Sequence, residues 1–212
     1  MKRGTGGLVL VLLAGLLAAC AGGRDSPIAK RLHDLEQQIA PTPARFILCA
    51  GHGCRDRHVV ALTSAQWARI RARFSPAPPD AAAERQAIRL AVADLEVMSG
   101  EQTGTSADRA GTYLNMFAAN QLDCADETVN VTTYLRLMID DGLITRHRPG
   151  GRVHKGNFLD SLPHMAPTLV DKVTGIAWVI DAWYHDNGHL PETVPATVWH
   201  TPWETWRTEG QL

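Results

Sequence analysis

The sequence predicts an α+β fold, in which helices come first and an antiparallel sheet follows within one domain. Between residues 63 and 142, three segments carry apolar residues at helical spacing. Residues 165–183 instead form two short apolar runs, rich in β-branched and aromatic residues. The turn-forming stretch Asp171–Gly175 separates these two runs, so we expect a β-hairpin there. The chain of 212 residues is long enough for one domain with a sizeable core.

Residues 1–20 have the pattern of an export signal. Lys2 and Arg3 form a basic start, residues 8–17 are almost entirely apolar, and small residues precede Cys20. The apolar run is shorter than the roughly 20 residues that span a bilayer. A cysteine at this point resembles the bacterial lipoprotein signal, in which the thiol is lipidated and becomes the mature N-terminus. The alternative is an ordinary signal peptide with a cysteine at its cleavage site.

The residues after Cys20 bear on location and domain boundaries. Ala21 and Gly22 follow it instead of an acidic residue, which by the same resemblance favours an outer-membrane anchor facing the periplasm over the inner membrane. Residues 21–44 are expected to form a tether, and residues 45–212 the folded domain. Without the basic start the formal charge falls from -1 to about -3 with signs mixed, which does not suggest a nucleic-acid partner.

Two of the four cysteines are close enough to bond to each other. Cys49 and Cys54 are separated by Ala-Gly-His-Gly, and the two glycines allow the chain to turn back between strand-like flanks. An exported protein meets an oxidising environment, so this spacing predicts a disulfide across a hairpin. A metal site formed by Cys49, His52 and Cys54 is the alternative. Cys124 remains as the thiol without a structural role.

The three helical segments carry recognisable end signals. They are a capping box at Thr63–Gln66 before a helix that stops at Ser75–Pro76, an Asp80 cap before a helix that ends at Gly100, and a helix from Cys124 to Asp141 that stops at Gly142. A short helix is expected at 113–119. Residues 146–157 are basic and contain glycines, and we expect a mobile loop there.

The chemistry of a thiol hydrolase is suggested by three residues in order along the chain. Cys124 follows Asp123, a suitable N-cap, so its sulfur would lie where the partial positive charge of a helix start favours a thiolate. His164 and Asp181 belong to the two strands of the predicted hairpin, where both side chains can reach one face. An imidazole can take the thiol proton, and a carboxylate can orient the imidazole. The three residues therefore predict a catalytic triad.

Residues 84–185 resemble the transglutaminase-like superfamily, including bacterial transglutaminase-like cysteine proteinases. The residues that carry the resemblance are Asp-Cys-Ala-Asp-Glu at 123–127, His164-Met165 and Trp-Val-Ile-Asp at 178–181. The resemblance implies a papain-like fold with helices packed on a C-terminal antiparallel sheet. It also implies Cys124 as nucleophile, His164 as general base and then acid, and Asp181 as its orienting group. One departure is Leu122, where the family usually has glycine.

Further candidate residues surround this triad. Gln121 is a candidate oxyanion donor, and Trp178, Trp183 and Trp199 are candidate groove walls. His154 is an alternative base. Two groups are alternative cation ligands, namely His185, Asp186 and His189 in a polar turn, and Asp123, Asp126 and Glu127 beside the nucleophile. Their simpler interpretations are turn formation and complementing the helix N-terminus, so we expect neither a metal nor a cofactor.

The sequence therefore predicts a lipid-anchored, exported thiol hydrolase. The expected substrate is an amide in a periplasmic protein or peptide, including cell-wall peptides, with a thioester intermediate that water or an amine resolves. Cell-wall amidases of the Cys–His–His type are a rival interpretation, although the second strand offers Asp181 where they use histidine. A non-catalytic binding or scaffold lipoprotein of the same fold is the alternative from another functional class.

Overall fold

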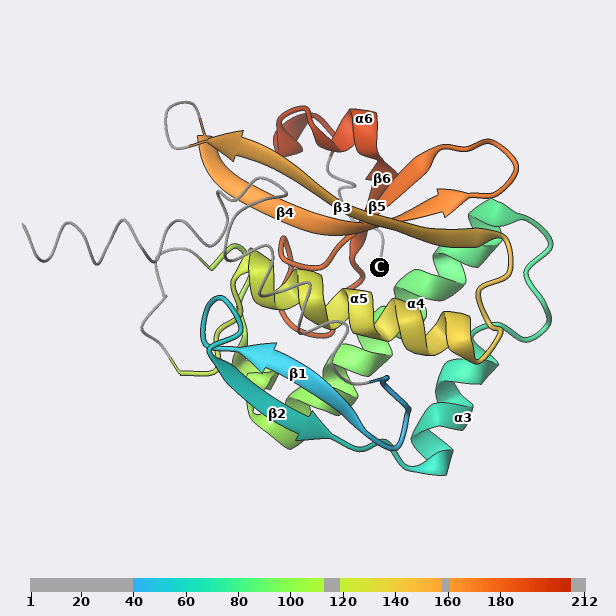
Figure 1. The fold of residues 1–212 in the computed structure, drawn as a ribbon, viewed down its shortest axis with the longest axis horizontal. Helices are drawn as coiled ribbons and strands as arrows, with labels where there is room; N and C mark the ends of the chain where they lie inside the picture. Colours follow the sequence, from blue (N-terminus) through green and yellow to red (C-terminus); the bar gives the residue numbers. More distant parts are fainter. Residues whose placement is uncertain (1–39, 113–118, 158–160, 207–212) are drawn as a thin grey trace, which may run out of the picture.

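The computed structural model describes residues 40–112, 119–157 and 161–206, and it has mixed helices and antiparallel sheets (Figure 1). The helices are α3 (Ser64–Ala72), α4 (Ala81–Thr103), α5 (Cys124–Asp140) and α6 (Ala196–Trp199), with 3-10 turns at Thr105–Ala107 and Trp203–Thr205. The strands are β1 (Phe46–Ala50), β2 (Asp56–Val60), β3 (His147–Asn157), β4 (Ser161–Asp171), β5 (Ala177–Asp181) and β6 (Glu192–Pro195). The α+β class predicted from the sequence is confirmed.

Helix α5 is the central element, because it lies between the two sheets (Figure 1). On one side is the four-stranded antiparallel sheet, ordered β3-β4-β5-β6, and on the other is the β1–β2 hairpin. Asn130 of α5 ties the helix to the hairpin. Its Oδ1 accepts a hydrogen bond from the Cys49 amide at 2.7 Å, and its Nδ2 donates one to the Cys49 carbonyl at 2.9 Å.

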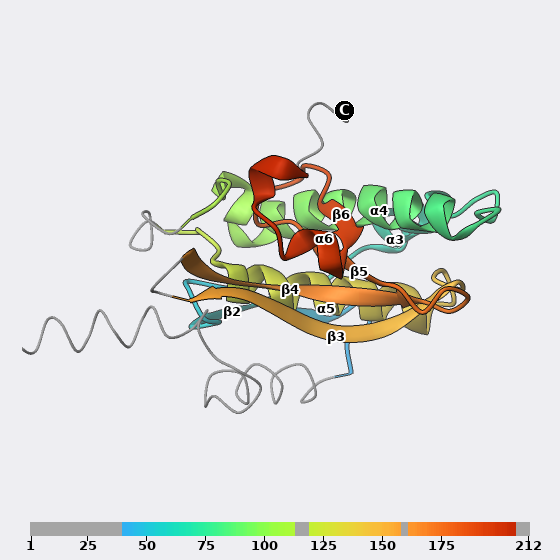
Figure 2. The ribbon, with the colours of Figure 1, turned by 90° about the horizontal axis from the view of Figure 1, so that it is seen from above.

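The four-stranded sheet is covered on both faces. Figure 2 views it from the α6 side, with α5 beneath. Leu169 and Ile180 belong to the main core with the helices, whereas Ala166 and Val179 pack with Trp199 of α6. Because neighbouring residues of a strand point to opposite faces, this division tells which side each site residue occupies.

The helix ends largely follow the predicted signals. Thr63 and Gln66 make the capping box of α3, and Asp80 caps α4. The predicted end of α4 at Gly100 was wrong, since the helix continues to Thr103 and ends at Gly104 in the left-handed conformation. Gly100 instead allows Ser106 to pack closely against the helix. A Cβ there would lie only 2.8 Å from Ser106 Oγ and 2.9 Å from the Ser106 amide nitrogen.

The basic segment 146–157 was predicted as a loop, and this prediction was wrong. It forms β3, the edge strand that pairs along nearly the whole of β4. Its glycines lie at or beside the points where the pairing register with β4 shifts, and they do not form a loop. A Cβ at Gly150 would meet the Thr168 side chain of β4. The pairing makes β4 start before residue 165, so His164 lies within the strand and directly opposite Lys155.

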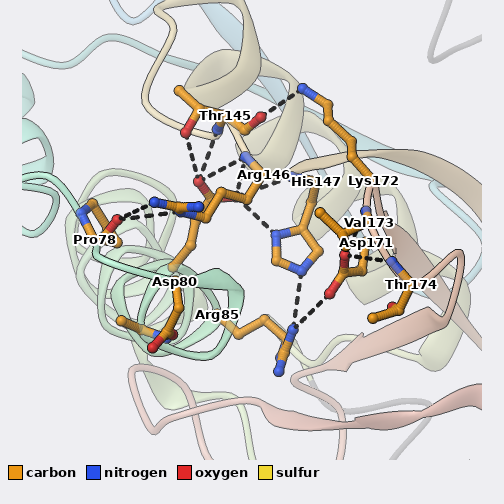
Figure 3. Close-up of polar contacts among 12 residues, drawn as sticks. Pro78, Asp80, Arg85, Thr145, Arg146, His147, Asp171, Lys172, Val173 and Thr174 are labelled. Atoms are coloured by element: carbon orange, nitrogen blue, oxygen red, sulfur yellow. Dashed lines mark hydrogen bonds and ion pairs between the residues drawn. The ribbon is translucent and has the colours of Figure 1, made fainter.

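A buried polar network fastens the start of α4 to the start of β3 (Figure 3). The Glu84 carboxylate accepts hydrogen bonds from the backbone amides of Thr145, Arg146 and His147, and from His147 Nδ1 at 2.8 Å. Arg85 NH1, which can only donate, lies 3.2 Å from His147 Nε2. The two His147 ring nitrogens thus link Glu84 and Arg85 of α4 to the start of β3.

Several predictions from the N-terminal part of the chain concern residues outside those described. They are the export signal, most of the 21–44 tether and the short helix at 113–119. Among the described residues, none of the helices combines the length and the apolar character needed to cross a membrane.

Candidate active site

The centre of the candidate site is a buried histidine–aspartate pair on two neighbouring strands. His164 of β4 and Asp181 at the end of β5 lie on the face of the sheet that α6 covers, and the His164 Nε2 to Asp181 Oδ2 distance is 2.7 Å. Each residue is only 2% exposed. A carboxylate can only accept hydrogen bonds, so Nε2 carries the proton. The predicted pairing of these two residues is thus present in the structure.

A second donor holds the same carboxylate oxygen. Trp199 of α6 is fully buried, and its indole Nε1 donates to Asp181 Oδ2 at 2.7 Å. The Trp199 ring also lies 5.4 Å from the His164 ring, between centroids. The sequence suggested Trp199 only as a groove wall, whereas the structure makes it a hydrogen-bond partner that fixes the position of Asp181.

The other nitrogen of the imidazole is poised to take a proton. His164 Nδ1 is buried and makes no hydrogen bond within the described part of the chain. With the proton of a neutral ring on Nε2, Nδ1 keeps its lone pair. A buried acceptor without a partner is costly, and such exceptions call for a functional explanation. The arrangement is that of a general base oriented by a carboxylate.

Cys124 begins α5, which packs on the face of the sheet opposite to the one that carries the His164 side chain, and the described residues contain no hydrogen bond to His164 Nδ1. It belongs to a buried cluster with Met165, which follows His164 in β4, and with Trp183. The Trp183 ring packs on the His164 ring at 4.6 Å between centroids. In addition, Thr128 Oγ1 donates to both the Cys124 carbonyl, at 2.6 Å, and the Met165 carbonyl, at 3.1 Å. The first turn of α5 is thereby fixed beside the strand that carries the histidine.

Cys124 is fully buried and is disulfide-bonded in this structure. The cysteine count predicted a reduced thiol instead. The second bridge, between Cys49 and Cys54, is the predicted one. Both members of that bridge belong to the same buried cluster as Cys124.

The start of α5 is rich in buried carboxyl groups. Asp123 Oδ1 accepts hydrogen bonds from the amides of Ala125 and Asp126, which are therefore not available to hold an oxyanion. Burial raises the pKa of Asp126 well above its usual value, and the neighbouring Asp123 adds to this. Burial and nearby carboxyl groups, Glu96 first among them, likewise raise the pKa of Glu127. Protonation of these groups lowers the negative charge that would disfavour a thiolate at the helix start.

The Cys49–Cys54 loop closes over this helix start. Residues 51–54 all have positive φ angles, which turns successive amides inwards. The amides of His52 and Cys54 donate to the Asp126 carboxylate at 2.8 and 2.6 Å. The Asp126 carboxylate thus links the disulfide loop to the helix that carries Cys124.

Aromatic rings enclose the His164 side chain. Besides Trp183 and Trp199, the Tyr184 ring meets it edge-on at 5.1 Å. Lys155, opposite His164 in β3, donates from Nζ to the Trp199 carbonyl at 2.8 Å and lies over the Trp199 ring at 4.4 Å. Tyr184 and Lys155 were not predicted from the sequence. The only signal for Lys155 was a strand register that depends on pairing between distant residues.

Other predicted residues lie elsewhere or have other roles. Gln121 Nε2 donates to the Ala107 carbonyl and its Oε1 accepts from the Arg109 amide, so the side chain fixes a neighbouring loop. Trp178 precedes Asp181 by three residues, so it projects from the opposite face of β5, where the Arg85 guanidinium stacks on its ring at 3.6 Å.

The remaining histidines do not join the pair. His154 is opposite Met165 in the register and shares its face of the sheet, the one towards α5, whereas His164 points to the other face. His185 bonds to Glu192 at 3.0 Å, and Asp186 accepts from Arg109 and from the Ala110 amide. Among the described residues, no group of three or more His, Cys, Asp or Glu side chains is placed to hold a metal ion.

No family model matches this chain, and neither the curated proteins nor the solved structures searched contain a match.

Proposed function

We propose that this protein is an exported thiol hydrolase with a transglutaminase-like, papain-like fold, in which Cys124 in its reduced form is the nucleophile. The observation that carries the proposal is the buried His164–Asp181 pair. Trp199 fixes its carboxylate, and its Nδ1 makes no hydrogen bond within the described part of the chain. The start of α5, with Cys124 as its first residue, packs against Met165, the residue that follows His164. The proposal requires that the reduced Cys124 thiol reaches the His164 ring.

The proposed reaction transfers an acyl group from an amide to sulfur. His164 Nδ1 takes the thiol proton, and the thiolate attacks the carbonyl carbon. The C–N bond then breaks, and the amine leaves with the proton that His164 returns. Water, or an amine, resolves the thioester and regenerates the thiol. Asp181 supports the imidazolium that forms between these steps.

The proposed setting is the bacterial envelope, with the chain anchored through a lipid on Cys20 and facing the periplasm. Lipidation converts the Cys20 thiol to a thioether. The three cysteines that remain are an odd number and cannot all pair within one chain. We therefore expect Cys124 to be reduced in the lipidated protein. Replacing Cys20 with serine should move the protein from the membrane fraction to the soluble periplasmic fraction.

Trapping of the acyl-enzyme tests the proposed activity. Reduced protein is mixed with candidate amide substrates, including cell-wall peptides, quenched in acid and examined by mass spectrometry. The proposal expects an acyl group on Cys124 as a thioester, which His164→Ala should not accumulate. A mass increase on other residues, or an equal yield in His164→Ala, would argue against it.

A second candidate is a non-catalytic binding or scaffold lipoprotein. It is favoured by one observation, namely that Cys124 is closed to solvent and forms a disulfide in this structure. In that case the lipidated protein would still contain a Cys124 disulfide, to a small thiol or to another chain. Non-reducing mass spectrometry of protein purified from membranes separates the two candidates.

A further inference from the structure

Lys155, Tyr184 and Trp199 form a surface beside His164, which we call the aromatic surface. Two of its members contact the histidine ring directly, Tyr184 at 5.1 Å and Trp199 at 5.4 Å between centroids. The third, Lys155, places its ammonium over the rings of both, at 4.4 Å from Trp199 and 5.4 Å from Tyr184. The aromatic surface therefore combines the partly buried Tyr184 ring and the fully buried Trp199 ring with the Lys155 cation.

The C-terminal segment 202–206 lies on the aromatic surface through its two tryptophans. Trp203 stacks on Tyr184 with 4.8 Å between centroids and an interplanar angle of 4°. Trp206 meets Tyr184 edge-on at 5.8 Å, and the Lys155 ammonium lies 5.1 Å from the Trp206 centroid. Each of these contacts joins a side chain of the segment to a side chain of the surface.

The backbone of this segment forms a hydrogen-bonded turn. Several hydrogen bonds of this segment join residues within 201–206. The Thr205 amide and hydroxyl donate to the Pro202 carbonyl, and Trp206 donates from its amide to Trp203 and from Nε1 to Thr201. The segment is therefore a compact turn, and its described contacts with the aromatic surface are made by the rings of Trp203 and Trp206.

We propose that the aromatic surface is a peptide-binding subsite for aromatic side chains, which the chain's own Trp203 and Trp206 occupy in this structure. The binding claim stands on the ring contacts alone. The claim that a bound peptide is a substrate rests in addition on the proposed function. In that case the subsite would select amide substrates with an aromatic residue near the bond to be cleaved.

The energies involved permit exchange between the segment and an added peptide. An aromatic pair contributes about 0.5–1.5 kcal/mol beyond its buried area, and a cation–π contact about 0.5–2 kcal/mol. A tethered ligand nevertheless acts at an effective concentration of order millimolar. A peptide at micromolar concentration should therefore bind only when the segment has lost its tryptophans.

The test uses the full chain with Trp203→Ala and Trp206→Ala together. The probe is a fluorescent synthetic peptide of residues 201–212, TPWETWRTEGQL. Fluorescence anisotropy should show binding to the double variant at least tenfold tighter than to the unaltered protein. The matched control is the same peptide with both tryptophans replaced by alanine, which should not bind.

Adding Tyr184→Ala to the double variant should abolish peptide binding, and adding Lys155→Met should weaken it severalfold, provided that circular dichroism shows folded protein. If the double variant fails to bind the peptide, or if it binds the alanine peptide equally well, the proposal is overturned. Binding that survives both surface changes would overturn it too. None of these measurements needs turnover, so their outcome is independent of whether Cys124 is reactive.

Discussion

At the residue scale, two tryptophans differ in whether the indole N–H makes a hydrogen bond. Trp199 donates to the carboxylate of Asp181, which is itself bonded to His164. Trp178 lies on β5, the same strand as Asp181, and its Nε1 is buried without a hydrogen bond in the described structure. Replacement with phenylalanine removes the N–H and part of the ring in both cases. A cation also lies over each ring, Arg85 over Trp178 and Lys155 over Trp199, so the main difference between the two variants is the lost hydrogen bond to Asp181.

Trp199→Phe should lower the free energy of unfolding by about 1–3 kcal/mol more than Trp178→Phe, because it leaves a buried carboxylate with one donor fewer. Urea unfolding followed by circular dichroism measures both values. Equal losses would show that the Trp199 N–H contributes nothing beyond packing.

Glu84 provides a second residue-scale prediction. Burial alone would raise its pKa, but hydrogen bonds from His147, Thr145 and Arg146 outweigh burial and lower the pKa to about 2. A carboxyl group whose pKa is lowered in the folded state stabilises the fold at pH values above its ordinary pKa. This stabilisation is lost as the pH falls towards the folded-state pKa. Glu84→Gln should therefore cost about 2–4 kcal/mol at pH 7, and the deficit should shrink between about pH 4.5 and pH 2.

Chemical denaturation across this pH range measures the Glu84 effect. Glu101→Gln is the matched control, because Glu101 lies on the same helix but is exposed. It should change stability by less than about 0.5 kcal/mol. A Glu84→Gln deficit that stays constant from neutral to acid pH would contradict the role given to the charge.

At the element scale, the parts that sequence could predict are those set by local signals. The caps at Thr63, Asp80 and Asp123 each appear as expected, because a side chain bonds to amides two or three residues away. Strand β3 could not be predicted in this way. Its charged residues and glycines are typical of a loop, and only pairing with β4 makes it a strand.

The candidate site likewise contains residues that could be predicted from the sequence and residues that could not. His164 and Asp181 were predictable, because polar residues in apolar strands need a partner. Their aromatic surroundings were not, since Tyr184, Trp199 and Lys155 come together only through the order of strands and the position of α6. Long-range packing leaves no periodic signal in the sequence.

The link between α5 and the disulfide hairpin gives an element-scale prediction. Asn130→Ala removes two buried hydrogen bonds to the Cys49 backbone and should cost about 2–4 kcal/mol. Thr132→Ala, on the same helix, removes a hydroxyl that has no hydrogen bond in the described structure, and should be neutral or slightly stabilising. Guanidinium unfolding of both variants with the disulfides intact makes the comparison. Similar losses in the two variants would be evidence against the Asn130 link.

At the scale of the whole molecule, the buried carboxyl groups should set the pH dependence of stability. Burial raises the pKa of Glu96 to about 8 and that of Asp108 to about 7. Glu96 Oε1 is buried without a hydrogen bond in the described chain, as expected if the group is protonated. A raised carboxyl pKa means that the folded state binds more protons, so stability is present at low pH and is lost as the pH rises through the folded-state value.

The thermal midpoint should therefore fall as the pH rises from about 5 to about 8. Glu96→Gln, which mimics the protonated side chain, should make the midpoint less dependent on pH over this range. Differential scanning calorimetry in buffers of equal ionic strength measures the effect. A midpoint that rises with pH, or an unchanged slope in Glu96→Gln, would contradict the assignment of protonated carboxyl groups to the interior.

The central claim is that Cys124 and the His164–Asp181 pair act together, and the rate of Cys124 alkylation across pH tests it most directly. The protein is first reduced, and mass spectrometry identifies the modified residue. The account predicts that Cys124 reacts at about pH 6–7, and that His164→Ala slows this reaction at least tenfold. An ordinary thiol reacts mainly above about pH 8. A Cys124 rate that rises only in that range and is the same in His164→Ala would contradict the account.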